Sequence, residues 1–92
     1  MPRPSFQPLP HYTVDQWLQR SWQRPTDGRR YRVELSQNLF GEWVLIREWW
    51  GVASKRRGSK KQGVNTYAEG VECLEAVAKR RMQRGYVVTE IS

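Results

Sequence analysis

The sequence predicts one small α+β domain, in which antiparallel strands precede a single long helix. Residues 31–50 alternate between apolar and polar side chains around a glycine-containing turn, which is typical of a β-hairpin. Residues 68–84 instead place apolar side chains three or four positions apart, as an amphipathic helix does. A chain of 92 residues has room for one hydrophobic core, so we expect both segments to share it.

The predicted hairpin consists of two alternating runs. Tyr31, Val33 and Leu35 alternate with polar side chains in the first run, and residues 38–41 form the turn. Alternation divides the second run between two faces, so that neighbouring tryptophans point to opposite sides of the sheet. One face carries Trp43, Leu45, Arg47 and Trp49, and the other carries Val44, Ile46, Glu48 and Trp50.

Both ends of the predicted helix have recognisable signals. Acidic side chains lie in its first half and basic ones in its last turns, which matches the helix dipole. Gly85 follows the last turn, where a left-handed C-cap is expected. We expect residues 86–88 to be a short apolar tail packed under the sheet.

The remaining segments have weaker or competing secondary-structure signals. Residues 14–23 fit either a helix, opened by Thr13 and Gln16 as a capping box, or a two-faced strand. The composition of residues 51–63 predicts a loop or loosely paired ribbon, and residues 64–67 a short strand. Four prolines make residues 1–12 an extended N-terminal arm, which leaves residues 13–92 as the domain.

Charge and composition narrow the function classes. Sixteen Lys and Arg against nine Asp and Glu give a net charge of +7, so polyanions are the expected partners. Five tryptophans exclude a disordered basic tail, and the lack of a long apolar run predicts no membrane segment. Cys73 is the only cysteine, which rules out an intrachain disulfide and favours a cytoplasmic location.

Enzymatic activity is not expected. His11 is the only histidine, Cys73 has no histidine near it in sequence, and no glycine-rich phosphate loop follows a strand. The three carboxylates of the predicted helix are spaced by three residues, as on a solvated helix face. We therefore expect no cofactor, no metal site and no small-molecule substrate.

The strongest electrostatic signal is the basic segment, residues 55–61, in which five of seven side chains are cationic. Crowded like charges repel one another, and an anionic partner relieves this repulsion. Nearby tryptophans add flat surfaces for a sugar or base. The candidate nucleic-acid-binding residues are Arg47, Trp49, Trp50, Lys55, Arg56, Arg57, Lys60 and Lys61. The run 79–84 is explained more simply by the helix dipole.

Three runs of residues resemble one known family. They are Tyr31-Arg32-Val33-Glu34-Leu35, then Leu39-Phe40-Gly41-Glu42-Trp43 continuing to Trp49, and the helix end Lys79-Arg80-Arg81 with Arg84-Gly85-Tyr86. Over roughly residues 15–87 they resemble the WGR domain, especially its short stand-alone bacterial members. The resemblance implies an antiparallel sheet of about four strands with one long C-terminal helix across it, and favours a strand over 14–23.

The resemblance also implies a binding function without catalysis. In poly(ADP-ribose) polymerases the WGR module has its motif tryptophan against the sugar at a DNA end, while the motif arginine contacts the backbone. Here the motif reads Trp49-Trp50-Gly51-Val52, so either tryptophan can be the motif residue and the arginine is absent. The basic segment would then supply phosphate contacts as point charges.

Two functions follow as hypotheses. The first is nucleic-acid binding, with DNA expected more than RNA, a nucleoid location, and a larger DNA-processing protein as a further partner. The alternative is an adaptor module that docks an acidic protein partner.

Overall fold

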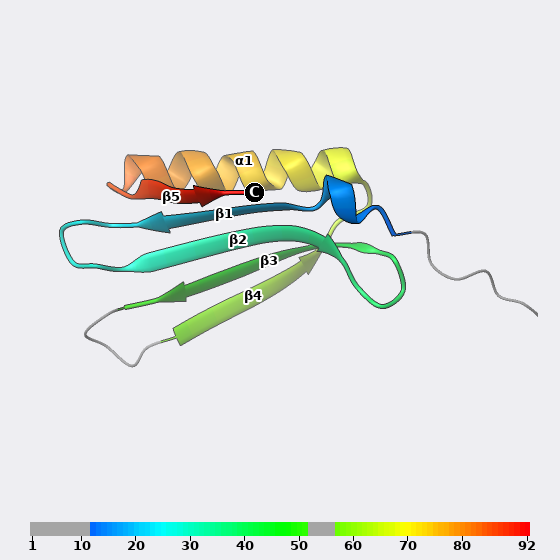
Figure 1. Ribbon diagram of the computed structural model, residues 1–92, viewed down its shortest axis with the longest axis horizontal. Helices are drawn as coiled ribbons and strands as arrows, with labels where there is room; N and C mark the ends of the chain where they lie inside the picture. The colour runs from blue at the N-terminus through cyan, green and yellow to red at the C-terminus, as the bar shows by residue number, and fades with distance from the viewer. Residues whose placement is uncertain (1–11, 52–56) are drawn as a thin grey trace, which may run out of the picture.

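The computed structural model describes residues 12–51 and 57–92, and the predicted N-terminal arm lies almost entirely outside them. In this part of the chain, one antiparallel sheet of five strands has one helix across it (Figure 1). The elements are η1 (Val14–Gln16), β1 (Leu18–Gln23), β2 (Arg30–Gln37), β3 (Trp43–Trp50), β4 (Arg57–Gly63), α1 (Tyr67–Gln83) and β5 (Val87–Ile91). The sheet order is β4-β3-β2-β1-β5. The predicted fold class is confirmed, with one strand more than the four expected.

Strands β2 and β3 form the predicted hairpin along their whole length. Arg30 lies opposite Trp50 at one end, and Gln37 lies opposite Trp43 at the other. Gly41 closes the turn with a φ of 76°, a conformation that residues other than glycine rarely adopt. The hairpin prediction is therefore confirmed.

Residues 14–23 form a single 3-10 turn followed by strand β1. The hydroxyl of Thr13 does not cap this turn. Instead the Thr13 backbone N–H donates to Gln37 Oε1 at 2.8 Å, which fastens the turn to the end of β2. From Leu18 the chain pairs with β2, so the strand favoured by the resemblance is right and the helix is wrong.

Three other sequence expectations are corrected. Of the loop or loosely paired ribbon expected over 51–63, the described residues 57–63 form strand β4, because they supply hydrogen-bonding partners to the outer side of β3. The ribbon alternative is therefore right for these residues, and the loop is wrong. Val64 is buried outside any strand, and Tyr67 already begins α1. The predicted apolar tail 86–88 is only partly right, because Tyr86 is buried in the core but Val87 and Val88 are exposed and pair with β1 as part of the edge strand 87–91.

The core lies between α1 and one face of the sheet. Helix α1 packs against β2 and β3, and Leu74 is fully buried between them. The buried apolar residues are Trp22, Tyr31, Val33, Leu35, Leu45, Val64, Leu74, Ala78 and Tyr86. The described residues place no second layer on the other sheet face, as antiparallel sheets allow.

Both ends of α1 are capped by local chemistry. The Thr66 hydroxyl accepts from the Glu69 N–H at 3.1 Å, and the Glu69 carboxylate accepts from the Asn65 N–H at 3.2 Å. At the other end Gly85 has a φ of 82°, and the Tyr86 N–H donates to the Arg81 carbonyl at 3.0 Å. This is a Schellman motif, which confirms the predicted stop and turns Tyr86 back into the core.

Gly70 is required where α1 approaches β2. A Cβ atom at this position would lie 2.5 Å from Leu35 Cδ1, and Leu35 is completely buried. Gly70→Ala should therefore lower the free energy of unfolding by about 1 to 3 kcal/mol, despite the better helix propensity of alanine. Urea denaturation measures this change. Gly63→Ala is the control, because its Cβ meets nothing within 4 Å, and a stabilised Gly70→Ala protein would contradict the close contact.

Candidate functional site

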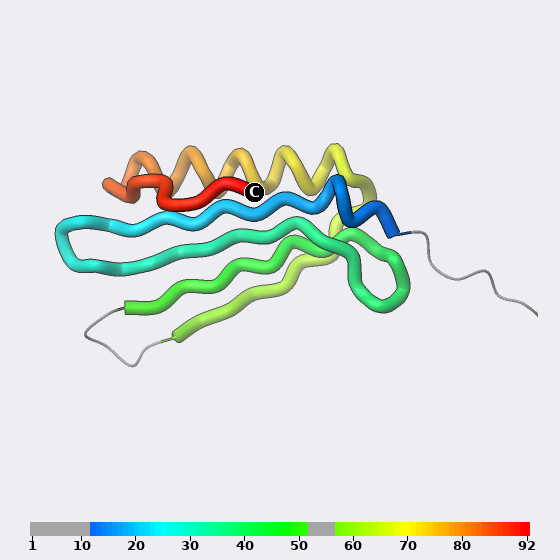
Figure 2. Tube along the Cα trace, in the orientation of Figure 1, coloured from blue at the N-terminus to red at the C-terminus, as the bar shows by residue number. Residues whose placement is uncertain are grey.

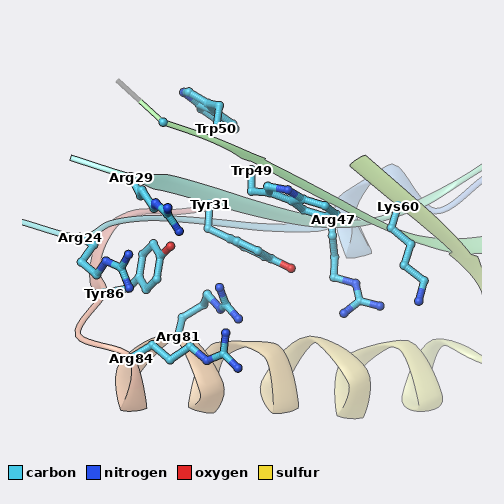
Figure 3. A pocket seen from close by; sticks show the side chains of 11 residues that line it. Arg24, Arg29, Tyr31, Arg47, Trp49, Trp50, Lys60, Arg81, Arg84 and Tyr86 are labelled. Carbon is cyan, nitrogen blue, oxygen red and sulfur yellow. The ribbon is translucent and has the colours of Figure 1, made fainter. Parts of the chain in front are cut away.

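The main cavity lies at one end of the molecule, where several elements meet. Figure 2 shows the β1–β2 turn, the end of α1 and the end of β3 together at this end. The cavity has a volume of about 460 Å³, and its described lining contains six cationic side chains and no carboxylate. We call it the basic pocket; it is lined by Arg24, Arg29, Tyr31, Arg47, Trp49, Trp50, Gly51, Lys60, Arg81, Arg84 and Tyr86 (Figure 3).

An aromatic floor is formed by cross-strand neighbours on the helix side of the sheet. Tyr31, Trp49 and Gly58 lie opposite one another on β2, β3 and β4. The Trp49 indole lies over Gly58, where an added Cβ would come within 2.1 Å of the ring. The rings of Tyr31 and Trp49 are nearly parallel, at 14°, with centroids 5.9 Å apart. Trp49 remains 39% exposed and so presents aromatic surface to the pocket.

Arg81 reaches this floor from α1. Its Cζ atom lies 4.2 Å from the centroid of the Tyr31 ring and 5.2 Å from that of Tyr86. Both distances fit cation–π contacts, which hold the guanidinium in place and leave its positive charge uncompensated. The Schellman motif brings Tyr86 to this position, so the end of the helix directly shapes the pocket.

Arg47 and Arg81 are half-buried cations with unused donors. The Nε atom of each is buried and has no hydrogen-bond partner in the described part of the chain. Arg47 makes only a long contact of 3.5 Å with Gln62 Oε1, and neither arginine forms an ion pair with the described carboxylates. Buried polar groups are normally satisfied, so these two donors are unusual, and they share this state with Trp22 Nε1 and Arg32 Nε outside the pocket.

The other side of the pocket is electrostatically different, because Asp27 compensates its cations. Arg24 Nε donates to Asp27 Oδ1 at 3.0 Å, and Arg29 Nε lies 3.4 Å from Asp27 Oδ2. The hydrogen bond from Arg24 is the largest cause that lowers the pKa of Asp27 to about 2. Among the lining residues, Arg47, Lys60, Arg81 and Arg84 therefore remain without an ion pair in the described ranges 12–51 and 57–92.

The structure separates the residues that the sequence grouped together. Lys60 lies opposite Arg47, on the helix side of the sheet, and both line the pocket with Trp49. Alternation along β4 places Arg57 and Lys61 on the other face. Trp50 also lines the pocket, but its side chain points away from α1 (Figure 3). Lys55 and Arg56 lie outside the described residues.

Four pocket cations were not among the sequence candidates. Arg81 and Arg84 have an ordinary explanation as C-terminal helix charges, and their position next to Gly85 was the available signal. Arg24 and Arg29 flank the β1–β2 turn, so a hairpin at this position brings them together. No sequence pattern indicated that the turn and the helix end would meet.

Comparisons with known proteins give no match: no family model, curated protein or solved structure is similar to the chain. The resemblance to the WGR domain therefore rests on the residue runs quoted above. Within the described residues, no helix has the length and apolarity to cross a membrane. The same residues contain no cluster of three or more metal-binding side chains.

Gly58 is expected to control the position of Trp49. In Gly58→Ala the new methyl group must displace the indole from the strand, so the near-ultraviolet circular dichroism of the Tyr31–Trp49 pair should change. The free energy of unfolding should fall by about 1 to 3 kcal/mol, the usual cost of overpacking. Gly63→Ala, on the same strand but with open space around its Cβ, should leave both quantities unchanged.

The Arg24–Asp27 pair should make stability depend on acid pH. The folded-state pKa of Asp27 is about 2, below its usual value near 4 in an unfolded chain. The pair therefore stabilises the fold above pH ~4, and this contribution is lost as the pH falls toward ~2. Urea denaturation between pH 6 and 2 should show a smaller loss for Asp27→Asn than for the unmodified protein. Equal losses in the two proteins would contradict the assignment.

Proposed function

We propose that this domain is a non-enzymatic nucleic-acid-binding module, and that the basic pocket is its binding site. The observation that carries the proposal is a set of four cations without ion-pair partners in the described part of the chain, placed around an exposed aromatic floor. Phosphates supply the missing negative charge, and nucleotide rings and sugars suit the aromatic surface.

The cations divide into two kinds with different roles. Arg47 and Arg81 are half-buried and present planar guanidinium groups, which bind phosphate through paired hydrogen bonds. Lys60 and Arg84 are exposed and act mainly through their charge, attracting the nucleic-acid backbone and releasing its counterions. Half-burial strengthens the first pair, because water screens charges there less than it does at the surface.

The WGR resemblance makes DNA the first polymer to test. Under this proposal Trp49 is the motif tryptophan, because it forms the pocket floor, whereas Trp50 points to the other side of the sheet. Arg47 and Arg81 then provide the guanidinium groups that the motif itself lacks. Lys55 and Arg56 remain candidate phosphate contacts, outside the described residues.

An adaptor that docks an acidic protein segment is the second candidate. The guanidinium groups of Arg47 and Arg81 pair with carboxylates as readily as with phosphates. The two candidates differ in the use of the floor, because a carboxylate chain has no ring to place on Trp49. If polyglutamate displaces a bound oligonucleotide at equal charge concentration, the adaptor function is favoured.

The salt dependence of binding tests the proposal. The triple variant Arg47→Gln, Lys60→Gln and Arg84→Gln should lower DNA affinity and reduce the slope of log affinity against log salt by about 3 on duplex DNA. Fluorescence anisotropy of a labelled oligonucleotide measures both quantities.

The matched control removes three charges from the other face of the sheet. Arg30→Gln, Arg57→Gln and Lys61→Gln change the net charge equally, but none of these residues lines the pocket. This control should lose much less affinity than the pocket variant. If both triple variants lose the same affinity and slope, binding follows net charge alone and the pocket is not the site.

A further inference from the structure

We infer that the basic pocket takes an unpaired nucleotide of a single strand, with its base on Trp49 and its phosphates on the surrounding cations. The inference rests on the proposed function and narrows it from nucleic acid in general to strands with accessible bases. It depends on the orientation of the aromatic floor, the size of the pocket, and the position of Arg81.

The Trp49 ring is held as a platform. One side of the indole lies against the β4 backbone at Gly58, and Tyr31 lies beside it in a nearly parallel plane. The ring lines the basic pocket, and it also borders a smaller cavity beside Gly58. Only a base whose own faces are free can stack there. In a duplex the bases are already stacked on their neighbours, so a single strand fits this platform better.

The size of the pocket agrees with one nucleotide unit. A volume of about 460 Å³ lies in the range of pockets that enclose a small organic ligand. Proteins usually read duplex DNA with protruding elements, which enter a major groove about 12 Å wide. The basic pocket is concave instead of protruding. A duplex would therefore contact its rim through phosphates and leave the aromatic floor empty.

Arg81 lies beside the position that such a base would occupy. Its guanidinium lies 4.2 Å above Tyr31, and the Tyr31 plane is within 14° of the Trp49 plane. Arg81 and Trp49 both line the basic pocket, so a base stacked on Trp49 would share this space with the guanidinium. Because Nε of Arg81 is buried, the terminal nitrogens are the donors available to the base edge or to a phosphate.

A second cavity continues from the basic pocket along α1. It has a volume of about 200 Å³ and shares Tyr31, Arg47 and Arg81 with the first. Beyond these residues it extends to Arg80 and Gln62, which offer a further charge and a hydrogen-bonding side chain. A flexible single strand bound in the basic pocket could place a neighbouring phosphate near Arg80, whereas a rigid duplex could not bend to reach both cavities.

The decisive experiment compares three DNA ligands at one salt concentration by fluorescence anisotropy. The ligands are a 12-residue oligothymidylate, a blunt duplex of 12 base pairs, and a closed dumbbell duplex without free ends. The single strand should bind at least about 10-fold more tightly than the dumbbell, a factor within the range for one base stacked on an aromatic ring.

The outcomes separate the inference from the proposed function. If none of the three ligands binds, both the inference and the proposed function fail. If either duplex binds as tightly as the single strand, the pocket does not select unpaired bases, and nucleic-acid binding alone stands.

A pair of aromatic variants tests the platform itself. Trp49→Ala should abolish the preference for the single strand, while Phe40→Ala, which removes an exposed aromatic side chain that does not line the pocket, should retain it. Urea denaturation checks that each variant folds, and Trp49→Phe provides a smaller ring if the alanine variant does not fold. A preference that survives Trp49→Ala, or that persists undiminished in Trp49→Phe when only this variant folds, would overturn the assignment of the base to this ring.

Discussion

The alternation of side chains across a sheet covered on one face is the constraint on which the rest of this domain depends. Helix α1 packs against one side only, so each strand position either joins the core and pocket or faces outward. Trp49 and Trp50 are covalent neighbours, yet only the first belongs to the pocket floor. Alternation along β4 likewise places Lys60 in the pocket and Lys61 on the other face of the sheet.

The charge of Arg81 is held in the pocket by aromatic contacts instead of by a carboxylate. A buried ion pair would fix Arg81 but would also neutralise it, whereas the rings of Tyr31 and Tyr86 fix it and leave it cationic. Arg24 is held differently, because its ion pair with Asp27 neutralises its charge. The pocket thus has one compensated side and one uncompensated side, and the second side contains the Trp49 floor.

Much of the fold follows from local sequence signals, and the exceptions have a common cause. The hairpin and the helix stop at Gly85 were predictable because alternation and a left-handed cap are local properties. Strand β4 could be predicted only as a loop or a loosely paired ribbon, because Arg57–Gly63 has no apolar side chains and forms by pairing with β3. Strand β5 likewise depends on the free edge of β1, which the sequence of Val87–Ile91 does not reveal.

The candidate site was only partly predictable for the same reason. Arg47, Trp49 and Lys60 were found from strand alternation and local charge, and the structure brings them to one pocket. Arg81 joins them only because α1 crosses β2 and β3 and ends beside the β1–β2 turn. This arrangement depends on the tertiary packing of segments that are far apart in the sequence. When the helix is considered alone, the helix dipole is a sufficient explanation for the charge of Arg81.

The basic pocket already contains closely placed cations. Arg47 and Arg81 line it together with Lys60 and Arg84. Each added charge would be repelled by the two half-buried guanidinium groups, neither of which has an ion-pair partner in the described part of the chain. On the proposed function, the phosphate contacts of the pocket come mainly from side chains on the helix and the sheet. Side chains on these elements are held more rigidly than a loop residue, which favours a fixed position for one nucleotide over loose attraction to many.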